Sequence, residues 1–276
     1  MSVPEKSPPV ALTVAGSDSS SGAGLQADLK TFAAHGVYGL GAVTSVVAEI
    51  PGKVVSWDEV SAKLLREQLE VVAEGFPLAA IKTGMLATPA LVEVVCEFLQ
   101  GIPEVNRKLV VDPVMVASSG DVLLLPEAIE IYRTRLLPLA AVATPNLAET
   151  AVLLNRDPSD VAQMELDSAA REFADRYQCP VLVKGGHWQT GAEAVDVLWD
   201  GSELHRFAAA RVAGVDTHGT GCTLSAAIAA NLANGASLVD AIGSAKRYIT
   251  AAIGQAHTWP ERGAIRALNH FPDAVG

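Results

Sequence analysis

The sequence has few cysteines. Cys96, Cys179 and Cys222 are the three among 276 residues, and no two of them form a C-x-x-C pair. An odd count with wide spacing argues against a disulfide framework and against a structural zinc site. Free thiols are typical of a reducing compartment, so the sequence predicts a cytoplasmic protein.

Positive charge is also scarce. The chain has 20 Lys and Arg against 31 Asp and Glu, which gives a net charge of −11. Nucleic acids and anionic membrane surfaces need clustered Lys and Arg, so neither is expected as a partner. A small anionic substrate stays possible, because backbone N–H groups and one lysine can hold phosphate within an acidic protein.

Long, purely apolar segments are missing. The 23 residues Thr217–Val239 lack Asp, Glu, Lys and Arg, but they contain His218, Asn231, Asn234 and several glycines. This pattern favours a buried helix over a membrane span. The first nine residues carry two charges and no apolar run, so they are not expected to be a signal peptide.

Linkers, repeats and low-complexity segments are absent as well. Half of the residues are hydrophobic and 18% are charged, which permits a large core. We therefore expect a flexible N-terminal tail over residues 1–9 and a single domain over residues 10–276.

Apolar runs of strand length alternate with longer stretches of helical spacing. The runs are Val10–Ala15, Gly41–Ala48, Ala79–Thr83, Lys108–Val111, Ala141–Thr144 and Pro180–Lys184. The helical stretches are Leu25–Ala34, Ser61–Glu74, Pro89–Leu99, Pro126–Leu137, Leu147–Leu154 and Ser168–Tyr177. The alternation predicts an α/β fold with a mostly parallel sheet. A hairpin, Ala194–Trp199 with Glu203–Ala208, and a helical region to about His257 follow.

Polar and glycine-rich segments follow five of these strands. They are GSDSSSGAG from Gly16, GML from Gly84, DPVM from Asp112, PNLAE from Pro145 and GGH from Gly185. Ligands of such sheets bind outside the carboxyl ends of the strands. The sequence therefore predicts a site at this edge.

A second glycine-rich turn, DTHGTGC, runs from Asp216 to Cys222 into an apolar helical segment. Gly219 and Gly221 allow backbone N–H groups to converge on one spot, and the helix adds its N-terminal donors. Phosphoryl transfer needs such donors, because charge builds on the phosphate oxygens. An ordinary helix cap explains the turn equally well, and the lysine of a Walker A loop is missing.

Several charged residues sit at strand or helix ends. Lys184 ends an apolar strand, where an unpaired charge is costly, so a phosphate partner is expected. Asp112 ends another strand and is a candidate for holding a metal. Asn146 and Glu149 lie three residues apart, which suits Mg²⁺ or, alternatively, simple helix capping. His187 and His218 are candidate bases or caps.

Taken together, the motifs resemble the hydroxymethylpyrimidine and hydroxymethylpyrimidine phosphate kinases of thiamin biosynthesis, in the ribokinase-like superfamily. The matching segments include AGSDSSSGAGLQADLK, TSVVAE, IKTGML, VVDPVM, TPNLAE, VLVKGGH and THGTGCTLSAAIA. The resemblance implies a three-layer α/β/α sandwich with a mostly parallel central sheet. It also implies ATP with Mg²⁺, phosphorylation of an aminopyrimidine alcohol and its phosphate, and a homodimer.

The resemblance also implies roles for individual residues. Cys222 would be a catalytic residue facing the acceptor oxygen, either as a thiolate that accepts a proton or by positioning alone. Lys184 and the anion hole formed by the backbone of Gly219, Thr220 and Gly221 would complete the catalytic set. Residues that would bind the acceptor are Gly16, Asp28, Glu49, Met85 and Val114. Residues that would bind ATP are Asn146, Lys184, Thr217, Gly219 and Gly221. Asp112 and Glu149 would organise Mg²⁺.

The sequence departs from the family pattern at a few positions. Ser19 and Ser21 replace a frequent Pro and Gly in the first loop, and Ser118 replaces a frequent Lys before Ser-Gly-Asp. The segment after Val46, through GKVVSWDEV, is a candidate flap over the acceptor. A pyridoxal kinase of the same superfamily and a non-catalytic binding homologue are the alternative functions.

Overall fold

The computed structural model describes residues 7–106, 108–115, 123–157, 165–186, 192–212, 218–262 and 265–273. Thr217, Ser118 and His187 lie outside these residues, so the expectations that concern them stay predictions. The same holds for the proposed division into a tail over residues 1–9 and one domain.

A central sheet of nine strands dominates the described part of the chain, in the order β3-β2-β1-β4-β5-β6-β7-β8-β9. The parallel strands are β1 (Val10–Asp18), β2 (Tyr38–Ile50), β4 (Leu78–Thr83), β5 (Leu109–Val111), β6 (Val142–Ala143) and β7 (Val181–Lys184). The antiparallel strands are β3 (Lys53–Glu59), β8 (Glu193–Trp199) and β9 (Leu204–Ala210). The predicted α/β fold with a mostly parallel sheet is confirmed.

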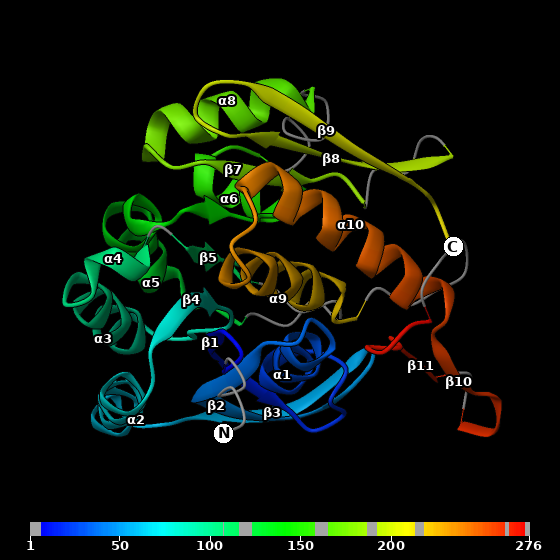
Figure 1. The fold of residues 1–276 in the computed structure, drawn as a ribbon. Coiled ribbons are helices and arrows are strands. Elements are labelled where there is room, and N and C mark those ends of the chain that lie inside the picture. Colours follow the sequence, from blue (N-terminus) through cyan, green and yellow to red (C-terminus); the bar gives the residue numbers. More distant parts are fainter. Residues whose placement is uncertain are drawn as a thin grey trace, which may run out of the picture.

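Helices cover both faces of this sheet (Figure 1). One face carries α1 (Gly24–Ala34), α9 (Thr220–Ala233) and α10 (Leu238–Gly254). The other carries α2 (Ala62–Gly75), α3 (Pro89–Gln100), α5 (Pro126–Ile131), α6 (Leu147–Leu154) and α8 (Leu166–Tyr177), with the short α4 (Pro103–Asn106) leading into β5. The result is a three-layer α/β/α arrangement.

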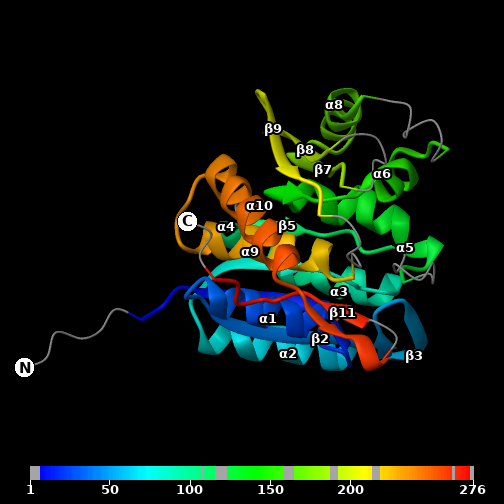
Figure 2. The same ribbon diagram turned by 90° about the vertical axis from the view of Figure 1, so that its right-hand side faces the viewer.

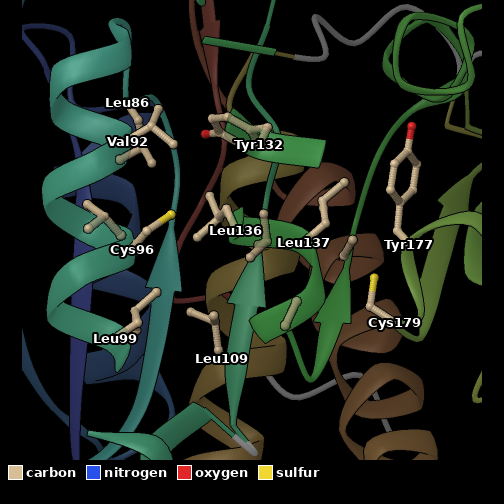
Figure 3. Packing of buried hydrophobic residues seen from close by; sticks show 14 of the residues in the cluster. Leu86, Val92, Cys96, Leu99, Leu109, Tyr132, Leu136, Leu137, Tyr177 and Cys179 are labelled. Atoms are coloured by element: carbon tan, nitrogen blue, oxygen red, sulfur yellow. The ribbon is translucent and has the colours of Figure 1, made fainter. Parts of the chain in front are cut away.

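Alternate side chains of each strand face opposite sides of the sheet and contribute to two hydrophobic cores. In β1, Leu12 and Val14 belong to the core under α2 and α3, whereas Ala11 belongs to the core under α1 and α9. Successive side chains of a strand point to opposite faces, so a strand buried on both sides is apolar throughout. Figure 3 shows the first core, where Cys96 and Leu99 lie among the apolar side chains around Leu109.

Two predicted helical segments are interrupted. The stretch expected to be helical from Pro126 to Leu137 is regular only to Ile131, and a π-helical turn and a 3-10 turn continue it to Leu139. Pro138 lacks an N–H and disfavours the helical conformation of the residue before it. The segment after the GTGC turn divides into α9 and α10, because Gly235 adopts φ +91 and Ser237 caps α10.

The chain ends in a small antiparallel pair, β10 (His257–Trp259) and β11 (Ile265–Ala267), joined through a 3-10 turn over Pro260–Arg262. Figures 1 and 2 show this pair after α10, apart from the central sheet. Among the described helices, none combines the length and the apolar character that a membrane crossing requires.

The candidate flap is a β-hairpin. Strand β2 runs two residues beyond the predicted end at Ala48, and β3 returns along it after a turn at Pro51 and Gly52. Proline favours the first inner position of such a turn, and Gly52 supplies the positive φ of +78. We call residues 47–54 the flap.

Candidate active site

A cavity of about 290 Å³ opens at the carboxyl ends of the parallel strands. Segments that are far apart in sequence line it: the loop after β1, the flap, the loops after β4 and β5, and the start of α6. The end of β7, strands β8 and β9, the GTGC turn and α10 complete the wall. The polar segments that follow the predicted strands therefore meet at one edge, as the parallel topology requires.

The GTGC turn leads directly into α9. Gly219 caps the helix with φ +79, and a β-carbon there would lie 1.9 Å from the carbonyl oxygen of Gly22. A β-carbon on Gly221 would lie 3.1 Å from Nζ of Lys184. The first glycine is thus required by the conformation and by contact with the other glycine-rich loop. The second leaves room for a lysine beside the helix N-terminus.

Asp18 organises the loop after β1. Its carboxylate accepts hydrogen bonds from the backbone N–H groups of Ser20, Gly22 and Ala23, at 2.7, 3.0 and 2.7 Å. Nε2 of His218 lies 3.0 Å from the same carboxylate. Burial raises the pKa of Asp18, but these hydrogen bonds outweigh it and hold the pKa below its ordinary value. His218 thereby joins the GTGC turn to the first loop.

Lys184 is paired with Asp112 in this structure. Its Nζ lies 3.0 Å from Oδ1 of Asp112, whose Oδ2 accepts a hydrogen bond from Ser225 at 3.1 Å. Burial opposes the charge on Asp112, but the positive charge of Lys184 keeps its pKa lowered. Without a ligand, a carboxylate is thus the partner of Lys184, and the expected phosphate contact stays a prediction. The ends of β5 and β7 lie close enough in the sheet for a carboxylate to serve.

A second buried pair, which the sequence reasoning missed, links Lys82 to Asp28. Nζ of Lys82 donates to both carboxylate oxygens of Asp28, at 2.9 and 2.7 Å, and Thr13 donates to Asp28 at 2.5 Å. Both side chains of the pair are fully buried. Lys82 lines the cavity, whereas Asp28 lies behind it. The expected direct contact of Asp28 with an acceptor is thus corrected to a contact with Lys82.

Charge and burial oppose each other in this pair. Burial raises the pKa of Asp28, although Lys82 and Thr13 act against the shift. For Lys82, burial alone would lower the pKa, but the charge of Asp28 raises it. Lys82 consequently stays charged at neutral pH and presents a fixed positive charge at the cavity wall.

Cys222 lies in the first turn of α9 and lines the cavity. Its surroundings are enclosed, so burial raises the pKa of the thiol to about 11, even though the charge of Lys82 acts in the opposite direction. The group is therefore a neutral thiol at pH 7. Burial likewise raises the pKa of Cys96 to about 11 and that of Cys179 to about 12, and these two thiols lie in the core.

Asn146 and Glu149 form a capping box at the start of α6. Oδ1 of Asn146 accepts from the Glu149 N–H at 2.9 Å, and Oε2 of Glu149 accepts from the Asn146 N–H at 2.8 Å. The capping alternative is thus present, yet both residues also line the cavity together with Asp112. Burial raises the pKa of Glu149 to about 7, although the charge of Lys184 acts in the opposite direction.

Apolar side chains from β9, α9 and α10 line one part of the cavity, which we call the apolar slot. Ala209, Leu224, Ile249 and Ile253 are among its lining residues. A further ion pair borders it, because Nζ of Lys246 lies 2.6 Å from Oδ2 of Asp196. The slot and this pair were not predicted, because their members come from segments that only the fold brings together.

A family model described as phosphomethylpyrimidine kinase matches residues 18–264, which is most of the chain. The chain belongs to the phosphomethylpyrimidine kinase family. A hydroxymethylpyrimidine/phosphomethylpyrimidine kinase of Rhizobium meliloti is 45% identical over 248 residues, covering 90% of this chain and 91% of the relative. One of Streptomyces coelicolor is 44% identical over 268 residues and covers 97% and 96%.

Solved structures agree with this phosphomethylpyrimidine kinase assignment at the level of the fold. The ADP complex of Bacillus subtilis pyridoxal kinase superposes with a TM-score of 0.84 at 36% identity, covering 96% of this chain and 98% of that one. The ribokinase-like α/β/α sandwich implied by the sequence resemblance is thereby confirmed.

Within this kinase fold, the cavity brings together nearly all the predicted site residues. The lining residues are Gly16, Glu49, Met85, Asp112, Val114, Asn146, Glu149, Lys184, Gly219, Thr220, Gly221 and Cys222. Their individual roles stay predictions. Asp28 is the exception behind the wall, and Thr217 lies outside the described residues.

Lys82 is the main residue that the sequence reasoning passed over. It stands inside the apolar strand LAAIKT, as Lys184 stands at the end of VLVK. The signal that singled out Lys184, a lysine in a strand buried on both faces, was therefore present for Lys82 too.

Proposed function

We propose that this protein is an ATP-dependent kinase of thiamin biosynthesis. It phosphorylates 4-amino-5-hydroxymethyl-2-methylpyrimidine to the monophosphate, and the monophosphate to the diphosphate, in the cytoplasm. The observation that carries the proposal is that the GTGC turn, the flap and the apolar slot beside α10 all line one cavity. The part of this cavity next to the flap is the proposed acceptor compartment. The names of the relatives from Rhizobium meliloti and Streptomyces coelicolor support the same reaction.

The acceptor would occupy the compartment under the flap. Glu49 would accept a hydrogen bond from the exocyclic amine of the pyrimidine. Met85 and Val114 would pack against the ring, since both belong to the apolar wall there. Gly16 allows the close packing of this wall, because a β-carbon at this position would lie 2.7 Å from Oγ of Ser45 and 3.2 Å from Sδ of Met85.

ATP would bind on the other side of the turn, with its base in the apolar slot. Its phosphates would meet Lys184, Asn146, Thr217 and the backbone N–H groups of Gly219, Thr220 and Gly221. Lys184 is 13% exposed at its side chain and reaches the cavity, so it can turn from Asp112 to a phosphate.

Asp112 and Glu149 would hold Mg²⁺. The donors fit this ion, because they are carboxylate oxygens on the cavity wall, and burial raises the pKa of Glu149 even though the charge of Lys184 acts against the shift. Bound Mg²⁺ supplies positive charge to the phosphate oxygens. It would also replace Lys184 as the partner of Asp112, which frees the lysine for ATP.

The first transfer forms a bond between the acceptor's hydroxymethyl oxygen and the γ-phosphorus, and the second forms a bond between an oxygen of the monophosphate and the γ-phosphorus of another ATP. Each transfer breaks the bond between that phosphorus and the oxygen that leaves with ADP. In the first transfer, the hydroxyl proton is lost to solvent or to the transferred phosphoryl group. Cys222 acts by positioning the acceptor oxygen through its neutral thiol, since a loose transition state asks little of a base. Lys82 contributes a fixed positive charge beside the thiol.

A pyridoxal kinase activity is the second candidate, and the likeness to the Bacillus subtilis pyridoxal kinase favours it. Both acceptors present a hydroxymethyl group on a flat nitrogen heterocycle. Glu49 discriminates between them, because the aminopyrimidine offers an exocyclic amine.

We further propose that the protein forms a homodimer.

A phosphotransfer assay with ATP and Mg²⁺ tests the proposal, with products identified by mass. The acceptors are hydroxymethylpyrimidine, its monophosphate and pyridoxal. A diphosphate product from the pyrimidine is the expected result. Pyridoxal phosphate alone would establish the second candidate, and no product from any acceptor would favour a non-catalytic binding homologue.

A further inference from the structure

The hydroxyl group of Ser19 is bonded to the backbone of the flap at two points. Oγ of Ser19 donates to the carbonyl oxygen of Glu49 at 2.7 Å and accepts from the N–H of Glu49 at 2.9 Å. The backbone N–H of Ser19 also donates to the carbonyl oxygen of Val47 at 3.3 Å. One exposed serine thus joins the loop after β1 to the flap.

We call these hydrogen bonds of Ser19 the clamp. They begin where the parallel pairing of β1 with β2 ends. Strand β1 stops at Asp18, opposite Val47, while β2 continues to Ile50. Past Val47 the backbone groups of β2 that face β1 have no strand to pair with. Unpaired N–H and C=O groups are unfavourable in a folded chain, and the Ser19 hydroxyl satisfies one of each.

The clamp is also the hydrogen-bonded attachment of the flap beyond Ala48. From Glu49 to Val54, the two bonds to Ser19 are the hydrogen bonds that join the flap to the rest of the chain among the residues that the structure describes. Apolar contacts of Val47 and Val54 with Met85 provide the other attachment. Removing the hydroxyl would therefore loosen the flap without removing any cavity-lining side chain.

We propose that Ser19 is a positioning residue that sets the affinity for the acceptor by holding Glu49 over the acceptor compartment. Glu49 lines the cavity and Ser19 does not, so Ser19 acts through the flap. The inference deepens the proposed function and rests on it. A proline, which the resemblance leads us to expect at this position, has neither a hydroxyl nor an N–H and could form none of these three bonds.

The test compares Ser19→Ala with Ser19→Thr and Ser21→Ala. Thr keeps the hydroxyl. Ser21 lies two residues further along the same loop, and its hydroxyl forms no hydrogen bond within the described part of the chain. We expect Ser19→Ala to raise KM for hydroxymethylpyrimidine about threefold to tenfold, as for a lost hydrogen bond. KM for ATP and kcat should stay within about twofold, because the clamp acts on acceptor binding. Ser19→Thr and Ser21→Ala should resemble the unmodified protein.

Amide hydrogen exchange provides a readout that does not depend on turnover. The Glu49 amide should exchange faster in Ser19→Ala than in Ser21→Ala. An unchanged exchange rate at Glu49, an unchanged acceptor KM, or an equal rise of both KM values would overturn the inference. If the unmodified protein phosphorylates no pyrimidine, the proposed function fails, whereas the exchange measurement still decides whether Ser19 holds the flap.

Discussion

Two buried lysine–aspartate pairs flank the start of α9, and they differ in the exposed fraction of the lysine side chain. Lys82 and Asp28 are both fully buried and are joined by two short contacts, with Thr13 as a third partner. Lys184 and Asp112 share one contact of 3.0 Å, and the lysine side chain is 13% exposed. The first pair is sealed, whereas the second can exchange partners with a ligand.

The difference assigns the two lysines separate tasks. A buried pair is costly to break, because the remaining charge lies in a medium that cannot solvate it. Lys82 is therefore a permanent part of the wall near Cys222. Lys184 has a carboxylate partner that a metal ion can take over, so it can move to a phosphate. The proposed kinase needs both kinds of charge, one fixed and one exchangeable.

Breaking the sealed pair should have the largest effect on stability. Lys82→Met leaves Asp28 buried without its cation, so the free energy of unfolding should fall by about 3–5 kcal/mol. Chemical denaturation measures this loss. The control is Lys63→Met, because Lys63 is 81% exposed at its side chain and its surface pair with Glu67 should contribute little. Adding Asp28→Asn to Lys82→Met should restore part of the stability, and a further loss would contradict the sealed-pair interpretation.

Breaking the open pair should affect turnover more than stability. Lys184→Met should lower kcat/KM about a hundredfold to a thousandfold, as for a lost charged group at a transferring phosphoryl group. Asp112 keeps its contacts with Ser225 and Thr144, so the free energy of unfolding should fall less than in Lys82→Met. Steady-state kinetics and denaturation of the same preparations decide the question. Normal turnover in Lys184→Met would remove the distinction between the pairs.

A third prediction concerns Cys222, whose thiol is affected by the fixed positive charge of Lys82. Cys222→Ala should lower kcat roughly tenfold to a hundredfold and leave KM for ATP nearly unchanged, because the thiol is proposed to position the acceptor oxygen. Its pKa of about 11 means that the thiol loses its proton only well above pH 9. The pH–rate profile should therefore show no thiol ionisation between pH 6 and 9. A rate that rises around neutral pH in the unmodified protein and not in Cys222→Ser would show a thiolate base instead.

The smallest effect concerns Glu49 in the flap. Burial and the charge of Asp18 raise its pKa to about 7, with His218 acting in the opposite direction. The carboxylate, not the acid, accepts from an exocyclic amine, so acceptor KM should fall by less than about tenfold as the pH rises through 7. Glu49→Gln should remove this dependence when KM is measured between pH 5.5 and 8.5. A dependence that persists in Glu49→Gln would assign it to another group.

Much of the candidate site was predictable from local patterns. Gly219 and Gly221 predicted a turn in which backbone donors converge. Lys184 and Asp112 were candidate site residues because each is a charged residue at the end of an apolar strand. These inferences depend on sequence neighbours alone. Asp28 was misplaced, because its position on a helix beside a glycine-rich loop does not reveal whether it faces the cavity or a lysine 54 residues away.

The sequence by itself determined the alternation of strands and helices, the parallel sheet, the edge where the site lies and the family. Periodicity, turn residues and motifs are local, so they can be read from the chain directly. The tertiary structure alone decided which charges meet: Lys82 with Asp28, Lys184 with Asp112 at 72 residues' separation, and His218 with Asp18 at 200. Burial and ion pairing depend on neighbours in space, and these also set the pKa of Cys222 and Glu49.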